Sequence, residues 1–243
     1  MQNRIEQLKT GAGTMEVFIA HPDGDGPFPV AIQLMDAMGM REELRDLACR
    51  MASAGYYVLA PYFFYRTGVK GPIDPSAPDG MARIMAAYRE VTDERAIADV
   101  QDVLELADKD PAAGQGKIGL YGFCMGGRLA LILSQALGER VAAAASIHPG
   151  GLVTDQPGSP HKHLSRITGE MYFGIADQDE SATAAQMTEL QKALDVQGTA
   201  YQLEFHPGAL HGFMMRSRSE VYNEAAAEKV WERMQALFER RLP

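Results

Sequence analysis

Short apolar segments alternate along the chain with segments in which apolar residues recur every three or four positions. The short segments favour β-strands, and the longer period favours helices with one buried face. Val141–Ile147 is rich in alanine and therefore ambiguous by composition, so its assignment as a strand depends on the alternation around it. The predicted strands are Thr14–Ala20, Pro29–Met35, Tyr56–Ala60, Lys117–Tyr121, Val141–Ile147, Glu170–Ile175 and Tyr201–Phe205.

Helices are expected between these strands, at Arg41–Ala54, Thr92–Asp108, Met125–Leu137 and Ser181–Val196, with a last helix that begins near Ser217. Glu220 is spaced from Ser217 as in a capping box. Several strands are apolar on both faces, which is typical of a parallel sheet covered by helices on both sides. We therefore expect a single α/β domain over residues 1–243, with the turn-rich segment Arg66–Asp79 as an excursion within it.

Composition narrows the classes of function. With 46% hydrophobic residues, a chain of 243 residues can bury a core without metal or disulfide staples. The polar start, the absence of any run of 18 apolar residues and only two cysteines predict a cytoplasmic protein with free thiols and no membrane association. The formal charge of −9 disfavours nucleic acid as a partner. The expected partner is a small-molecule substrate, and the protein is expected to be a monomer or a homodimer.

Cys124 lies in the sequence "YGFCMGG", between the strand Lys117–Tyr121 and the buried helix Met125–Leu137. A nucleophile elbow needs this order, because its strained strand-to-helix turn requires small residues two places before and after the nucleophile. Gly122 and Gly126 occupy these places. A helix N-terminus also favours the thiolate. Cys49 lies in an amphipathic helix without glycine neighbours and is interpreted as a packing residue.

A thiol nucleophile needs a base, and the base needs an acid that orients it. In α/β-hydrolase sheets the order along the chain is nucleophile, acid, histidine. This order favours His211, in "GALHGF", as the base, whereas His206 is interpreted as a structural loop residue. The segment "ADQDES" offers Asp177 and Asp179 as the acid, and spacing alone does not separate them.

The chain resembles the dienelactone hydrolase family of α/β-hydrolases over nearly its whole length. The resemblance is carried by "PVAIQLMDAMGM", "AGYYVLAPYFFYR", "YGFCMGG", "ADQDES" and "LHGF". It implies an α/β-hydrolase fold, a Cys124-His211-Asp179 triad, with Asp177 as the fallback acid, and no cofactor. The expected activity is hydrolysis of a lactone or small carboxylic ester through a cysteine acyl-enzyme. The alternatives are a neutral ester or thioester hydrolase of the same fold, and a non-catalytic binding or redox-sensing relative.

The resemblance also implies roles for residues outside the triad. Asp36 takes the place of a glutamate that contacts the resting cysteine in founding members, and the backbone N–H groups of Ala37 and Met125 would form the oxyanion hole. Arg216 and Arg83 are candidates for holding a substrate carboxylate. His148 follows the strand Val141–Ile147 and is predicted to line the substrate pocket. No metal is predicted, because His161 and His163 lack further ligands at metal-like spacing.

Overall fold

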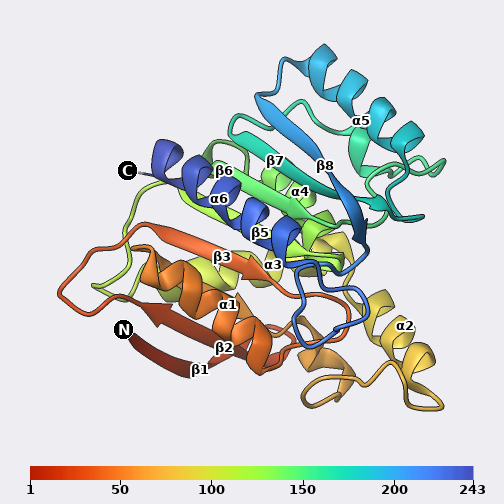
Figure 1. Ribbon diagram of the computed structural model, residues 1–243. Helices are drawn as coiled ribbons and strands as arrows, with labels where there is room; N and C mark the ends of the chain where they lie inside the picture. The colour runs from red at the N-terminus through yellow and green to blue at the C-terminus, as the bar shows by residue number, and fades with distance from the viewer. Residues whose placement is uncertain (243) are drawn as a thin grey trace. The chain divides into compact units, whose positions relative to one another are not determined.

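The computed structural model describes residues 1–242 (Figure 1). These residues form two compact units, which divide between Gly116 and Lys117. Residue 243 lies outside the described residues, and the single domain expected over 1–243 stays a prediction.

The first unit is built on four strands in the order β1-β2-β4-β3. β1 pairs with β2 and β2 with β4 in antiparallel directions, whereas β3 and β4 are parallel. The strands β3 and β4 are buried along their whole length, as their apolar sequences predict. The bounds are β1 Gln2–Thr10, β2 Gly13–His21, β3 Val30–Leu34 and β4 Tyr57–Pro61.

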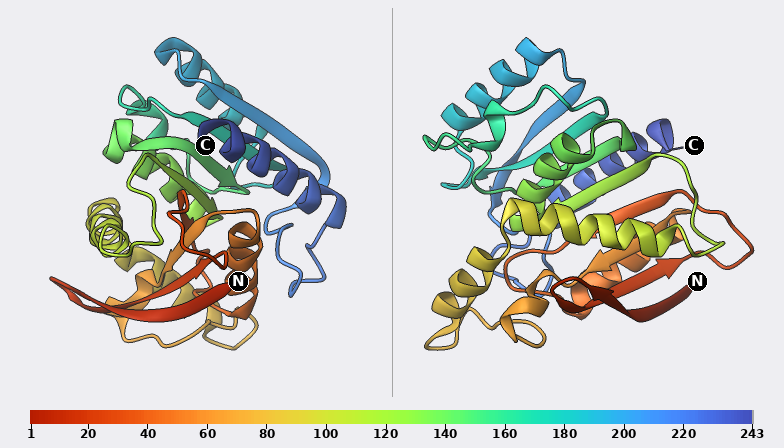
Figure 2. Two further views of the ribbon diagram at one scale, coloured as in Figure 1. Left: turned by 90° about the vertical axis from the view of Figure 1, so that its left-hand side faces the viewer. Right: turned by 180° about the vertical axis from the view of Figure 1, so that it is seen from behind.

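Helices cover both faces of these four strands. The helix α1 packs against β2 and β4 on one face, and α3 packs against β1 and β4 on the other (Figures 1 and 2). The Thr92 hydroxyl accepts a hydrogen bond from the backbone N–H of Arg95 and so caps α3 at its start. The bounds are α1 Glu42–Ser53, the 3₁₀ turn η1 Phe63–Thr67, α2 Gly80–Glu90 and α3 Asp93–Ala107.

The second unit is built on four parallel strands in the order β5-β6-β7-β8. They are β5 Ile118–Phe123, β6 Val141–Ile147, β7 Glu170–Gln178 and β8 Tyr201–Leu210. The alanine-rich segment is confirmed as the strand β6. It is fully buried, and its small side chains leave room for helices to pack closely above and below it.

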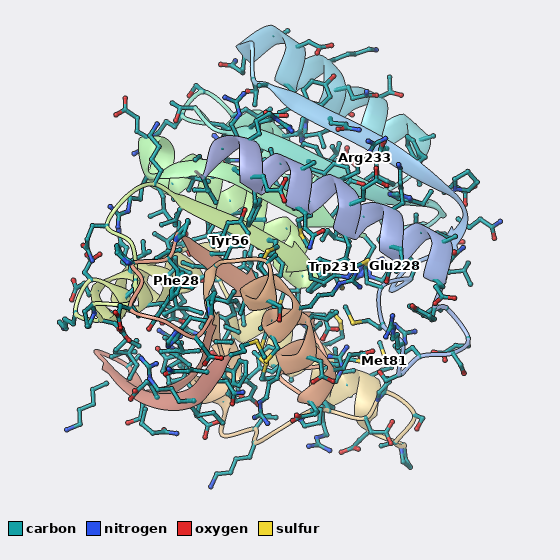
Figure 3. The ribbon with its side chains drawn as sticks, turned by 60° about the vertical axis from the view of Figure 1, so that its left-hand side comes forward. Phe28, Tyr56, Met81, Glu228, Trp231 and Arg233 are labelled. Atoms are coloured by element: carbon teal, nitrogen blue, oxygen red, sulfur yellow. The ribbon has the colours of Figure 1, made fainter. Side chains whose placement is uncertain are left out.

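In this unit α4 and α6 lie on opposite faces of the strands (Figures 1 and 2). Trp231 of α6, labelled in Figure 3, has its ring centroid 6.5 Å from that of Tyr121 on β5. A Cβ on Gly119 would lie 2.6 Å from the Phe238 ring, so glycine allows α6 to approach β5. The bounds are α4 Met125–Leu137, η2 Gly138–Arg140, η3 Pro160–Lys162, α5 Ala184–Gln197 and α6 Glu224–Arg241.

Several elements differ from those expected from sequence. The strand β1 was not anticipated, because it is largely polar and pairs on one side only. The last helix begins at Glu224 rather than near Ser217, because Asn223 caps it and Glu220 pairs with Arg218 instead of completing a capping box. The strand β8 extends past Phe205, where its pairing with β7 resumes after a register shift.

No helix within residues 1–242 combines the length and the apolar character that crossing a membrane requires.

A buried ion pair in the first unit should be important for stability. The two terminal guanidinium nitrogens of Arg66 each donate to one carboxylate oxygen of Asp99 at 2.7 Å, and the Tyr65 hydroxyl donates to Asp99 at 2.8 Å. Asp99→Ala should lower the free energy of unfolding by about 3–5 kcal/mol, because it leaves a poorly solvated guanidinium without its partner.

The matched control is Glu90→Ala, which breaks the exposed ion pair with Arg95 and should cost less than about 1 kcal/mol. Urea unfolding of both variants measures the difference. Equal losses of stability would contradict the expectation.

Candidate active site

Four residues with catalytic chemistry follow the four parallel strands of the second unit directly. They are Cys124 after β5, His148 after β6, Asp179 after β7 and His211 after β8. Strand pairing aligns these ends, since Phe123 lies opposite Ile147 and Gln178 lies opposite Leu210. Parallel strands present their carboxyl ends at one edge of the sheet, which is where ligands bind in open α/β folds.

Cys124 has a backbone conformation that L-residues rarely adopt. Its φ of 54° lies in the left-handed region, and it is the N-cap of α4. Its backbone N–H bonds the Ile147 carbonyl oxygen at 3.0 Å. A Cβ on Gly127 would lie 3.0 Å from that same oxygen, so a side chain at position 127 would crowd the contact between α4 and the end of β6. This is the geometry of a nucleophile elbow.

Asp179 is held at both carboxylate oxygens. Oδ1 accepts a hydrogen bond from the Ser181 backbone N–H at 2.8 Å, and Oδ2 lies 2.6 Å from Nδ1 of His211. The Asp179 side chain is only 2% exposed, whereas Asp177 lies on the surface. The structure therefore brings Asp179, and not Asp177, to the histidine. The carboxylate can only accept, so the Nδ1–H donates and Nε2 is available for Cys124.

The charge of His211 depends on its two neighbours, Asp179 and Cys124. Burial alone lowers the pKa of this imidazole, but hydrogen bonds with Asp179 and Cys124 and the negative charges of both groups outweigh burial and raise the pKa to about 10. At neutral pH His211 therefore carries its proton, next to the Cys124 sulfur. A protonated imidazole in this place can act as a proton donor.

His148 is 1% exposed and packs among aromatic rings. Its ring centroid lies 5.3 Å from that of His211, 5.4 Å from that of Phe213 and 6.0 Å from that of Phe123. Its predicted contact with substrate stays a prediction. Phe213 was not singled out from sequence, although the motif "HGF" places an aromatic residue two positions after the histidine.

Asp36 and Ala37 lie in the first unit, in the turn that follows β3. The Asp36 carboxylate accepts two hydrogen bonds from the Arg41 guanidinium, at 2.8 and 2.7 Å, and a third from the Met38 backbone N–H at 3.0 Å. Arg41 was missed from sequence, although it lies only five residues beyond the acid. The predicted contact between Asp36 and the resting cysteine stays a prediction.

Met125 is the first residue of α4, and its backbone N–H belongs to the first turn, where N–H groups have no partner within the helix. This placement suits one of the two predicted oxyanion donors. The pairing of Met125 with Ala37 stays a prediction.

Both arginine candidates are surface residues with acidic neighbours. The Arg216 side chain is 67% exposed, lies 3.6 Å from Glu228 of α6, and donates to the Tyr222 hydroxyl at 3.0 Å (Glu228 is labelled in Figure 3). The Arg83 side chain is 50% exposed and lies 4.0 Å from Asp79. The roles predicted for them in binding a carboxylate stay predictions.

The other histidines have local partners. His206 lies in the strand β8 rather than in a loop, with Nε2 3.2 Å from the Tyr172 hydroxyl, because β8 continues to pair with β7 beyond Phe205. His161 contacts Ser159 at 2.8 Å and Glu189 at 3.0 Å. His163 is exposed. Within the described residues, no three His, Cys, Asp or Glu side chains are grouped as ligands for a metal.

Cys49 lies within α1, as predicted. Burial and the nearby charges of Asp46 and Glu42 raise the pKa of its thiol, which disfavours the thiolate.

The elbow at Cys124, the histidine after β8 and the acid after β7 define the α/β-hydrolase class. Comparison with known proteins agrees. A crystal structure titled "Putative Dienelactone Hydrolase", from Klebsiella pneumoniae, superposes with a TM-score of 0.88 at 23% identity and covers 98% of both chains. This likeness confirms the predicted fold.

Residues 15–242 match the dienelactone hydrolase family. The chain therefore belongs to the dienelactone hydrolase family and is a hydrolase, as predicted. It is 27% identical to a Synechocystis protein named "Putative carboxymethylenebutenolidase", over 93% of this chain and 91% of the relative. It is 23% identical to a Bradyrhizobium protein named "Probable 2-oxo-3-(5-oxofuran-2-ylidene)propanoate lactonase", over 92% and 88%.

The raised pKa of His211 can be measured directly. Titration of histidine ¹⁵N resonances should show His211 losing its proton near pH 10. Because this pKa exceeds the ordinary 6.5, bound proton stabilises the fold fully below about pH 6.5, and that contribution is lost as the pH rises through about 10. Asp179→Asn removes a charge and an acceptor and should lower the pKa.

Asp177→Asn is the matched control, because Asp177 is an exposed aspartate two residues away. It should leave the His211 titration unchanged. If the two variants shift the titration equally, Asp179 is not the cause of the raised pKa.

Proposed function

We propose that this protein hydrolyses a lactone or small carboxylic ester through a Cys124 acyl-enzyme, with His211 as acid and base and Asp179 as its orienting acid. The observation that carries the proposal is the contact of His211 with Asp179 at 2.6 Å and with Cys124, from the ends of three parallel strands. The names of the relatives support the substrate class, since one is a lactonase and another a carboxymethylenebutenolidase.

In the first half-reaction the Cys124 thiolate attacks the carbonyl carbon, and a C–S bond forms as the carbonyl oxygen takes up negative charge. The C–O bond to the leaving group then breaks, and the His211 imidazolium gives its proton to the departing oxygen. The products of this step are a thioester on Cys124 and a neutral His211. In a lactone the leaving oxygen remains attached to the acyl chain.

In the second half-reaction His211 takes a proton from water as the water oxygen attacks the thioester carbonyl. The C–S bond breaks, the carboxylic acid leaves, and the thiolate and imidazolium are restored. Asp179 keeps its hydrogen bond to Nδ1 throughout, so the reacting nitrogen is Nε2 in both steps. The sum is ester plus water to acid plus alcohol.

The negative carbonyl oxygen needs donors that are in place before the reaction. The backbone N–H of Met125 is one, at the positive end of the α4 dipole, and Ala37 is proposed as the other. Removing one such donor from an enzyme typically costs about 3 kcal/mol of transition-state stabilisation.

A neutral ester or thioester is the second candidate substrate. The observation that favours it is the exposure of Arg216 and Arg83, each beside an acidic residue. An exposed guanidinium that already has a carboxylate neighbour offers little additional affinity for a substrate carboxylate.

The Cys124 acyl-enzyme can be detected. Rapid quenching during turnover of a slow ester, followed by mass spectrometry, should show the acyl mass on the peptide that contains Cys124. Cys124→Ala should lower kcat/KM by about 10⁴-fold or more, because no other group in the site replaces the nucleophile.

Cys49→Ala is the control for general loss of a thiol and should retain full activity. Unchanged hydrolysis in Cys124→Ala would refute the proposed mechanism. A wild type with neither adduct nor turnover would instead indicate a binding or redox-sensing relative.

Charge selectivity can be tested with two substrates. Arg216→Ala should change kcat/KM by less than about threefold for both an anionic lactone and a neutral short ester, because exposed ion pairs contribute little. Arg83→Ala serves as the paired variant. A loss confined to the anionic lactone in either variant would assign that arginine to the substrate carboxylate and exclude the second candidate.

A further inference from the structure

Two residues other than glycine have a φ in the left-handed region within residues 1–242, namely Cys124 at 54° and His148 at 34°. They are neighbours, because they follow Phe123 and Ile147, which pair directly. Each keeps its backbone N–H bonded to the next strand, Cys124 to Ile147 at 3.0 Å and His148 to Gly174 at 2.8 Å. Such a conformation costs about 1–3 kcal/mol per residue. At Cys124 the elbow requires this strained conformation. At His148 the strained conformation sets the direction of the side chain.

The strained backbone directs the His148 ring into the interior beside His211. The two ring planes meet at 66° with centroids 5.3 Å apart, which is the edge-to-face arrangement of aromatic pairs. Phe123 stacks on His148 from β5, and Phe213 meets it edge-on from the loop after β8. With three ring neighbours and 1% exposure, His148 has little freedom to move.

The His211 ring, by contrast, is less confined, and its orientation needs further support. Asp179 holds its ring at Nδ1, Cys124 is its other hydrogen-bond partner, and 30% of the side chain is exposed. In the proposed reaction the proton passes to the leaving oxygen and the bond with Cys124 is given up. The ring is then held at Nδ1 only and can pivot about that hydrogen bond, which moves Nε2. The His148 ring packs edge-to-face against the His211 ring, and a fixed neighbour at this distance restricts such a pivot.

We propose that His148 is a positioning residue, whose ring holds the His211 imidazole in the orientation that transfers a proton between Cys124 and the substrate. The inference rests on the proposed function. It requires the aromatic ring of His148 and the backbone conformation that directs it, and it does not require its nitrogens. A misplacement of about 1 Å in a catalytic group costs about 100-fold in rate.

Two variants separate the ring from the backbone. His148→Asn keeps a residue that tolerates a left-handed φ but removes the ring, and His148→Phe keeps a ring but removes the nitrogens. The measurement is the single-turnover rate of Cys124 acylation by an activated ester, with steady-state kcat and KM. His148→Asn should slow acylation by about 10- to 100-fold with KM unchanged, because only orientation is lost. His148→Phe should remain within about threefold of the wild type.

His161→Asn is the matched control. His161 is a buried histidine of the same unit, but its nitrogens contact Ser159 and Glu189. This variant should acylate at the wild-type rate. Thermal unfolding shows which variants are folded. If His148→Asn does not fold, His148→Leu replaces it, since leucine fills the space without a ring, and the same slowing is expected.

Acylation of His148→Asn, or of His148→Leu in its place, at the wild-type rate would overturn the inference. So would a His148→Phe variant as slow as the ringless one, because the nitrogens would then matter. A higher KM with unchanged kcat in His148→Asn would also overturn it, since His148 would then act by contacting the substrate. Failure of the proposed function looks different, because the wild type itself would form no adduct on Cys124.

Discussion

The parallel pairing of β5, β6, β7 and β8 is the constraint on which the site depends. Main-chain hydrogen bonds between neighbouring strands hold their carboxyl ends at one edge, so residues separated by up to 87 positions come within contact of one another. Every residue of the candidate triad is the first after a strand. No loop has to place these side chains, and the positions of Cys124, Asp179 and His211 inherit the rigidity of a buried sheet.

The charge of the site at this edge depends on three groups, Cys124, His211 and Asp179. Cys124 lies at the N-terminus of α4, and hydrogen bonds with Asp179 and Cys124 favour the protonated form of His211. Asp179 and Cys124 are thus the two groups that raise the pKa of His211. The left-handed backbone at Cys124 and His148 costs local stability at this edge of the sheet.

The first unit contains two bidentate ion pairs between arginine and aspartate. Arg41 pairs with Asp36 at the turn after β3, and Arg66 pairs with buried Asp99. Such pairs fix the orientation of both partners because the planar guanidinium matches the carboxylate.

The amino-acid sequence by itself determined the strand and helix alternation, the elbow at Cys124 and the choice of His211, because periodicity, glycine spacing and chain order are local properties. Spacing alone left Asp177 and Asp179 open, and the family resemblance favoured Asp179. Only the tertiary structure places Asp179 against His211 and packs His148 on the same ring. The physical reason is that these contacts join different strands. Their geometry depends on register and side-chain direction across the sheet, which no local pattern records.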